Sequence, residues 1–149
     1  MTKKIQTNSL KETKKLAQSI SAKIQGKTLI LLKGELGAGK TSFTQGLALG
    51  LDITKKVSSP TFTLMKNYQG RFTLNHIDAY RLEGHSQDLG FDELFDEDSV
   101  TVIEWPLFLI NDLPEACLKV NIEIGEGDCR IFEFIANGDA HEALIRHLK

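Results

Sequence analysis

The chain has 149 residues, 41% of them hydrophobic and 26% charged, a balance that is typical of a soluble globular protein with one substantial core. Its net charge is −2, so nothing in the overall charge balance suggests a protein that binds nucleic acid or another polyanion. The two cysteines lack metal-ligand spacing, and neither a signal-peptide pattern nor an apolar run of membrane-spanning length is present, so we expect one cytoplasmic domain over residues 1–149 without membrane contact.

The first predicted element is an amphipathic helix that begins after Ser9. Ser9 followed by Glu12 is the pattern of a capping box, in which each side chain pairs with the other residue's backbone N–H. Apolar and small residues then recur on one helical face up to Ile24, and Gly26 is expected to end the helix. Half of the lysines lie between residues 3 and 27, and we interpret them as a solvated helix face rather than as a binding patch.

A phosphate-loop pattern follows this helix. Residues 34–41 read Gly-Glu-Leu-Gly-Ala-Gly-Lys-Thr, with the glycines, lysine and threonine at the required spacing. The apolar run of residues 28–33 predicts a buried parallel strand before the loop. Residues 41–49 predict a helix after it, with Gly50 as the C-cap. Strand, loop and helix therefore occur in the order that phosphate binding requires.

The residue types of this loop suit a phosphate anion. Gly37 and Gly39 allow a tight turn whose backbone N–H groups converge on phosphate oxygens. The following helix adds unpaired N–H groups and the positive end of its dipole. Lys40 supplies a charge for the β- and γ-phosphates, and the Thr41 hydroxyl is a suitable ligand for Mg²⁺. The sequence therefore predicts a nucleotide site.

A polar segment and a β-hairpin are expected next. Pro60 excludes regular helix from residues 57–62, and the hydroxyl side chains make this segment polar. A polar segment of this kind can be ordered by contacts with γ-phosphate and Mg²⁺. An ordinary connecting loop is the alternative. Residues 61–68 and 71–78 are β-rich on either side of Gly70, which predicts an antiparallel hairpin.

The remaining residues complete a mixed sheet. The predicted elements are a helical or irregular segment at 81–95, a buried strand at 100–103 that leads into Glu104, a hairpin of strands 118–124 and 130–136, and a helix at 140–148 capped by Asp139. Together these elements predict an α/β fold, a single-domain P-loop NTPase whose mixed sheet has a parallel centre, antiparallel hairpins and flanking helices.

Two acids follow predicted strands, at the sheet edge where ligands bind in α/β proteins. A phosphate loop needs an acid to complete the Mg²⁺ site and to position water, and Glu104 and Asp78 are the candidates. Capping or a salt bridge is the alternative role for each. His76 and Arg81 flank Asp78, and both fit packing or surface positions equally well, although Arg81 is also a candidate for neutralising transferred charge.

Four motifs, in this order, resemble the TsaE family, the small bacterial ATPases required to make threonylcarbamoyladenosine in tRNA. The motifs are the phosphate loop at 34–41, Ser-Pro-Thr-Phe at 59–62, His-Ile-Asp-Ala-Tyr-Arg at 76–81 and Glu-Trp at 104–105. Three of them are unusual outside the family, and the resemblance covers essentially the whole chain.

The resemblance implies a Mg²⁺–ATP site. Thr41 and Glu104 would hold Mg²⁺, and Asp78 would join Lys40 and Glu104 in the catalytic set. The segment 59–62 would act as a switch near the γ-phosphate. The ATP phosphates would be wrapped by Glu35, Leu36, Gly37, Ala38, Gly39, Lys40, Thr41 and Ser42.

The same resemblance implies adenine contacts, an activity and partners. Adenine would contact the chain near Ser9 and Leu10 and at Arg130, and Trp105 would lie beside the site. The activity would be a weak Mg²⁺-dependent ATPase that supports repeated turnover of two partners, the TsaD and TsaB proteins. Since the sequence shows no tRNA-reading motif and no basic stripe, contact with tRNA is expected to be indirect.

Three other classes of phosphate-loop protein fit less well. A small-molecule or nucleoside kinase usually needs an arginine-rich lid, and the four arginines of this chain do not cluster. A GTPase would carry an Asn-Lys-x-Asp segment for guanine, which this sequence lacks. A nucleotide-binding adaptor without catalysis stays open, because weak hydrolysis and binding alone look the same in a sequence.

Overall fold

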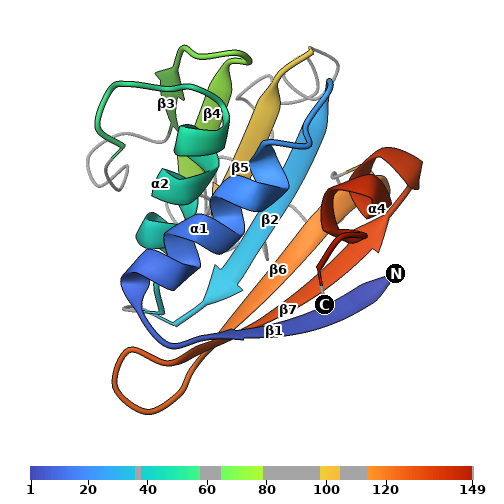
Figure 1. Cartoon of the computed structure of the whole chain (residues 1–149). Coiled ribbons are helices and arrows are strands. Elements are labelled where there is room, and N and C mark those ends of the chain that lie inside the picture. The colour runs from blue at the N-terminus through green and yellow to red at the C-terminus, as the bar shows by residue number, and fades with distance from the viewer. Residues whose placement is uncertain (36–37, 58–64, 79–97, 105–113, 149) are drawn as a thin grey trace, which may run out of the picture.

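A computed structural model gives the fold shown in Figure 1. It describes residues 1–35, 38–57, 65–78, 98–104 and 114–148, and of Asp78 it describes the backbone alone. Within these residues a seven-stranded mixed sheet has the order β1-β7-β6-β2-β5-β4-β3, which confirms the predicted α/β class. The strands are β1 (Thr2–Thr7), β2 (Thr28–Gly34), β3 (Met65–Tyr68), β4 (Leu74–Asp78), β5 (Val100–Glu104), β6 (Cys117–Ile124) and β7 (Arg130–Asn137).

The centre of the sheet is parallel, as predicted. β2 pairs in parallel with β5 on one side and with β6 on the other, and β5 pairs in parallel with β4. The register aligns Leu32 with Glu104, and Glu104 with Asp78. The carboxyl ends of β2, β5 and β4 therefore meet at one edge, which is where parallel sheets bind ligands.

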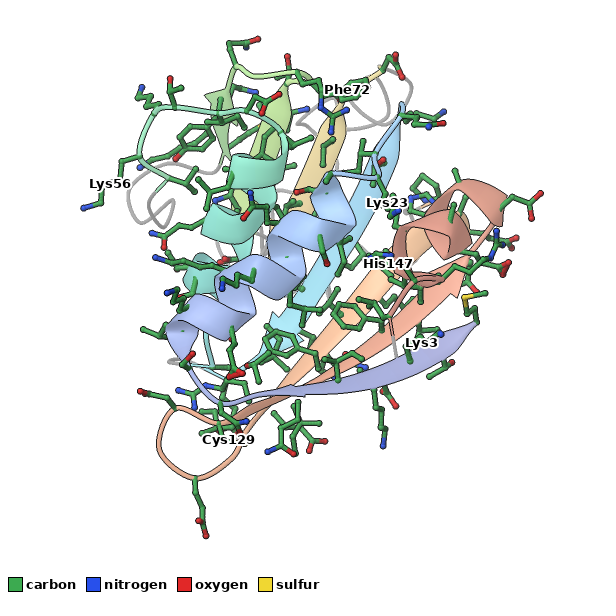
Figure 2. All side chains as sticks on the ribbon, viewed as in Figure 1. Lys3, Lys23, Lys56, Phe72, Cys129 and His147 are labelled. Atoms are coloured by element: carbon green, nitrogen blue, oxygen red, sulfur yellow. The ribbon has the colours of Figure 1, made fainter. Side chains whose placement is uncertain are left out.

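Both predicted hairpins are present. β6 and β7 pair antiparallel over their whole lengths, and β3 pairs antiparallel with β4. Residues 71–73, which we expected in a strand, instead form the connection between β3 and β4. The N–H of Arg71 bonds to the Leu51 carbonyl at 2.6 Å instead of to a neighbouring strand, and its guanidinium lies over the ring of Phe72, a residue that Figure 2 labels.

One strand was not predicted. β1 lies at the sheet edge and pairs antiparallel with β7, so Lys3 and Lys4 belong to a strand. Lys23 and Lys27 also lie outside a helix, and our interpretation of these four lysines as part of a helix face was wrong. Lys4 is exposed, as befits an edge strand, whereas Lys3 is half-buried. The Lys3 ammonium donates to the Leu148 carbonyl at 2.7 Å, which ties this edge to the end of the chain.

Three helices lie on the same face of the sheet (Figure 1): α1 (Leu10–Ser21), α2 (Lys40–Gly50) and α4 (Asp139–Ile145). α1 begins as predicted, since the Glu12 N–H donates to Ser9 Oγ at 3.1 Å. The Glu12 carboxylate, however, accepts from the N–H of Asn8 rather than from that of Ser9, so the capping box is shifted by one residue.

The helix ends differ from prediction by a few residues. α1 stops at Ser21, before Gly26, and Arg71 donates to the carbonyls of Ser21 and Ile24 at 3.0 and 2.7 Å. α2 runs through Gly50, which also accepts from Arg71, and its C-cap is the next residue. α4 begins at Asp139 with Gly138 as N-cap, and it ends at Ile145 rather than at residue 148. No helix among the described residues has the length and apolar character needed to cross a bilayer.

The hydrophobic core lies between the sheet and these helices. Phe43 of α2 stacks on Phe132 of β7 with ring centroids 5.5 Å apart, and Phe132 stacks on Phe134. α1 crosses α2 at Gly46, where an added Cβ would lie 2.7 Å from the Ala17 Cβ and closer still to the Lys14 carbonyl. The absence of a side chain at this position therefore sets the distance between the two helices.

We predict that Gly46→Ala destabilises the protein by about 1–3 kcal/mol, although alanine alone favours a helix. The cause is overlap with the α1 backbone, which cannot move without disturbing the core. Leu49→Ala is the matched control, because Leu49 is exposed on the same helix. Urea unfolding measures both variants, and equal stabilities would contradict the close crossing.

A buried histidine links α4 to the sheet. His141 is 5% exposed, and its Nε2 accepts from the Leu29 N–H at 3.1 Å. Nε2 must therefore keep its lone pair, and within the described part of the chain Nδ1 has no hydrogen-bond partner. Burial lowers the pKa of His141 below its ordinary value of 6.5.

This lowered pKa predicts a stability that falls in acid. The unfolded chain takes up a proton on His141 near pH 6.5, and the folded chain does so only at lower pH. The free energy of unfolding is therefore highest above pH 6.5, and it decreases as the pH falls below that value. The slope is at most about 1.4 kcal/mol per pH unit. His141→Gln, whose side-chain oxygen can still accept from Leu29, should flatten the dependence in urea unfolding between about pH 5 and about pH 8.

A second variant, His147→Gln, measures separately how much His147 contributes to the pH dependence of stability. His147 is exposed, and its pKa is lowered by partial burial first and then by Lys23 and Lys3, which Figure 2 labels. An unchanged pH profile in the His141 variant would show that its proton is not linked to folding.

Candidate functional site

The candidate site begins where β2 ends and α2 starts. The Ala38 N–H bonds back to the Glu35 carbonyl at 2.9 Å. Gly39 then has a φ of 102°, a conformation that other residues rarely adopt, and a Cβ there would have nothing within 4 Å. Gly39 is therefore fixed by its backbone conformation and not by crowding.

α2 starts without a side-chain cap. Its N-cap is Gly39, which has no side chain to accept from the first turn, and no side-chain hydrogen bond caps it. A helix start of this kind leaves backbone N–H groups and the positive end of the dipole for an anion. Thr41 and Ser42 are half-buried in the same first turn. Leu36 and Gly37 lie outside the described residues.

Lys40 is held across the loop. Its Nζ donates to the Gly34 carbonyl at 3.0 Å, and the side chain is only 9% exposed. This bond joins the last strand residue to the first helix residue, and so closes the loop on itself. Glu35, between them, is exposed.

Arg130, the first residue of β7, also contacts this loop. Its Nε donates to the Ala38 carbonyl at 3.1 Å, and its Nη1 donates to the carbonyls of Gly127 and Cys129 in the β6–β7 turn, where Figure 2 labels Cys129. The structure therefore brings Arg130 to the phosphate loop, which sequence spacing did not indicate.

Leu10 lies at the same end of the sheet. Thr7 of β1 pairs with Arg130 in the sheet register, and Leu10 follows three residues later as an exposed residue at the start of α1. The adenine contacts that we expect from Leu10 and Arg130 stay predictions.

Glu104 ends β5 as predicted and is buried, with 6% of its surface exposed. Its Oε1 lies 3.1 Å from Nε2 of His76, which is fully buried on β4. Both side chains share the sheet face of Leu74 and Val102, which belong to the core beneath the helices. Sequence reasoning left His76 without a role, although the alternation of Leu74–Asp78 indicates that it faces the core.

Several expected site residues are not described. Asp78 is level with Glu104 in the register, but only its backbone is described. The segment 59–62, Arg81 and Trp105 lie outside the described residues, and so does the predicted helical or irregular segment 81–95. Their roles stay predictions. In the described part of the chain, no three His, Cys, Asp or Glu side chains gather into a metal site.

Known proteins resemble this chain over most of its length. The family model described as "Threonylcarbamoyl adenosine biosynthesis protein TsaE" matches residues 7–131. The tRNA threonylcarbamoyladenosine biosynthesis protein TsaE of Bacillus subtilis (strain 168) is 42% identical over 138 residues, which cover 92% of this chain and 87% of that protein. The protein of the same name from Treponema pallidum (strain Nichols) is 37% identical over 120 residues, covering 79% of this chain and 89% of its own.

The fold has a counterpart among solved structures. The crystal structure of YdiB from Bacillus subtilis matches with a TM-score of 0.84 and 35% sequence identity, and the match covers 99% of this chain and 94% of that chain. The family match includes the phosphate loop, His76 and Glu104 well inside its bounds, and it includes Thr7 and Arg130 at or next to its two ends.

Proposed function

Because the chain belongs to the TsaE family, we propose that it is a weak Mg²⁺-dependent ATPase that supports the formation of threonylcarbamoyladenosine in tRNA through a partner complex. The observation that carries this proposal is the loop between β2 and α2. Its left-handed Gly39, the uncapped start of α2 and the ammonium of Lys40 follow β2 at the edge of the sheet where the neighbouring strand β5 ends in the buried Glu104.

The loop provides what a triphosphate needs. The N–H groups in the first turn of α2 would donate to phosphate oxygens, and Lys40 would supply a positive charge. The position of Lys40 favours this role, because its ammonium is already held at the loop by the Gly34 carbonyl and does not have to be ordered when ATP binds. Arg130 would hold the Ala38 end of the loop in the same way.

The donor set also fits Mg²⁺. A carboxylate and a hydroxyl are hard oxygen ligands, and Mg²⁺ commonly takes one or two protein ligands and completes its shell with phosphate oxygens and water. Glu104 and Thr41 would hold the ion, which when bound would neutralise charge on the phosphates. Asp78, level with Glu104 at the sheet edge, would orient the attacking water through its carboxylate.

The partners follow from the family. The relatives in Bacillus and Treponema are named for threonylcarbamoyladenosine biosynthesis, and we propose that this chain acts there with TsaD and TsaB. A net charge of −2 supports an indirect contact with tRNA. ATP consumption that required a small-molecule acceptor would instead favour a kinase.

We expect Lys40→Ala to weaken ATP binding about ten- to a hundred-fold, because a charge-assisted contact contributes about 1.5–3 kcal/mol. Lys33→Ala is the matched control, since Lys33 is an exposed lysine next to the same loop. Nucleotide titration measures both variants, with urea unfolding to confirm the fold, and ATP turnover is measured with and without TsaD and TsaB. Equal affinity in the two variants would show that this loop is not the phosphate site.

Substitutions of Glu104 and Asp78 should affect different steps. Glu104→Gln should raise the Mg²⁺ concentration that nucleotide binding requires, because an amide is a poorer Mg²⁺ ligand than a carboxylate. Asp78→Asn should keep binding and lose hydrolysis, about 100-fold or more if the residue acts as a base. Nucleotide titrations at several Mg²⁺ concentrations and single-turnover hydrolysis measure the two effects, and the reverse pattern would exchange the assignments.

A further inference from the structure

His76 and Glu104 form a buried polar pair between β4 and β5, on the sheet face that the helices cover. His76 has no exposed surface and Glu104 has 6%. β4 and β5 pair in parallel with His76 level with Val102, so Glu104 lies diagonally across from His76, one step further along the same face. Among the described residues, the only recorded hydrogen bond of the Glu104 carboxylate is the contact between Oε1 and His76 Nε2 at 3.1 Å.

The direction of this hydrogen bond follows from the two partners. A carboxylate that holds a metal ion must be ionised, and it can then only accept. His76 Nε2 must therefore carry a proton and donate it to Oε1. Nδ1 has no partner among the described residues, and it is the nitrogen that can keep a lone pair. The opposite tautomer would set a lone pair against the carboxylate and would leave a buried N–H without an acceptor.

We propose that His76 is a positioning residue for Glu104. By donating to Oε1, it fixes the orientation of the carboxylate and leaves Oε2 for Mg²⁺. This inference rests on the proposed function, in which Glu104 is a ligand of the ion. Hydrogen bonds of this kind orient metal ligands, and their loss typically weakens metal affinity about 10–100-fold.

Packing alone does not account for a histidine at this position. Leu74, which precedes His76 on this face of β4, and Val102, across from it on β5, are apolar and fully buried, whereas Lys66 of β3 pairs with His76 on its other side and Asp78 follows it on β4. An apolar side chain could pack against Leu74 and Val102 without burying a ring nitrogen that has no hydrogen-bond partner among the described residues, which costs stability. The contact with the Glu104 carboxylate accounts for a polar ring at this position.

Three substitutions separate positioning from packing. In His76→Gln, the amide nitrogen lies as many bonds from Cα as the imidazole Nε2 does, so it can still donate to Oε1. In His76→Asn, the amide nitrogen corresponds to Nδ1 and falls short. His76→Leu keeps apolar volume and removes the donor. The measured quantity is the Mg²⁺ concentration at half-maximal binding of a non-hydrolysable ATP analogue, and urea unfolding reports the fold of each variant.

We expect His76→Leu and His76→Asn to raise that Mg²⁺ concentration about 10–100-fold, and His76→Gln to stay close to the unchanged protein. Binding of the analogue without Mg²⁺ should be the same in all four proteins. A wild-type Mg²⁺ requirement in His76→Leu overturns the proposal. The proposal is also overturned if His76→Gln raises the Mg²⁺ concentration as much as His76→Leu does, since this would show that His76 acts through packing.

Glu104→Gln, measured in the same titration, distinguishes the proposed Mg²⁺-ligand role of Glu104 from the proposed positioning role of His76. If Glu104→Gln changes the Mg²⁺ requirement and His76→Leu does not, the positioning role alone fails. If Glu104→Gln changes nothing, the metal assignment in the proposed function fails and the positioning role fails with it.

A measurement on the unchanged protein covers variants that fail to fold. The ¹⁵N resonances of the His76 ring report which nitrogen is protonated. We expect a proton on Nε2, and a ring protonated on Nδ1 alone would overturn the proposal whatever the variants show.

Discussion

The parallel pairing of β2 with β5, and of β5 with β4, is the constraint on which the candidate site depends. Its register sets Leu32, Glu104 and Asp78 level with one another, two residues before β2 gives way to the phosphate loop at Gly34. Because side chains alternate between the faces of a sheet, a shift by one residue would turn Glu104 away from the helices and away from His76. The buried apolar residues of these strands therefore fix the chemistry at their ends.

Buried cations hold the loop that these strands carry. Lys40 and Arg130 are each 9% exposed, and they donate to the carbonyls of Gly34 and Ala38 near the two ends of the loop. Charge-assisted hydrogen bonds are stronger than neutral ones, so the loop is anchored at both ends by the chain itself. Less conformational freedom is then lost when an anion binds.

Local patterns in the sequence predicted most of this arrangement, and contacts between distant segments were missed. The strand before Gly34, the helix after it and both hairpins each have a signature within a few neighbouring residues. β1 has none, because its lysines suit an edge strand and a solvated helix equally well and only its pairing with β7 decides. The contacts of Arg130 with Ala38 and of His76 with Glu104 likewise depend on strand order, which no short stretch of sequence contains.

The strand order also bears on how the chain is made. β2 lies inside the sheet, yet both of its neighbours, β5 and β6, come much later in the sequence. During translation β2 therefore leaves the ribosome long before either of its partner strands has been synthesised. α1 and α2 come directly before and after β2 in the chain, so they can cover one of its faces in the meantime. β1 is the first strand to be synthesised, and its partner β7 is the last strand of the described chain. During most of its synthesis the protein thus presents an unpaired apolar strand, the kind of edge on which nascent chains aggregate.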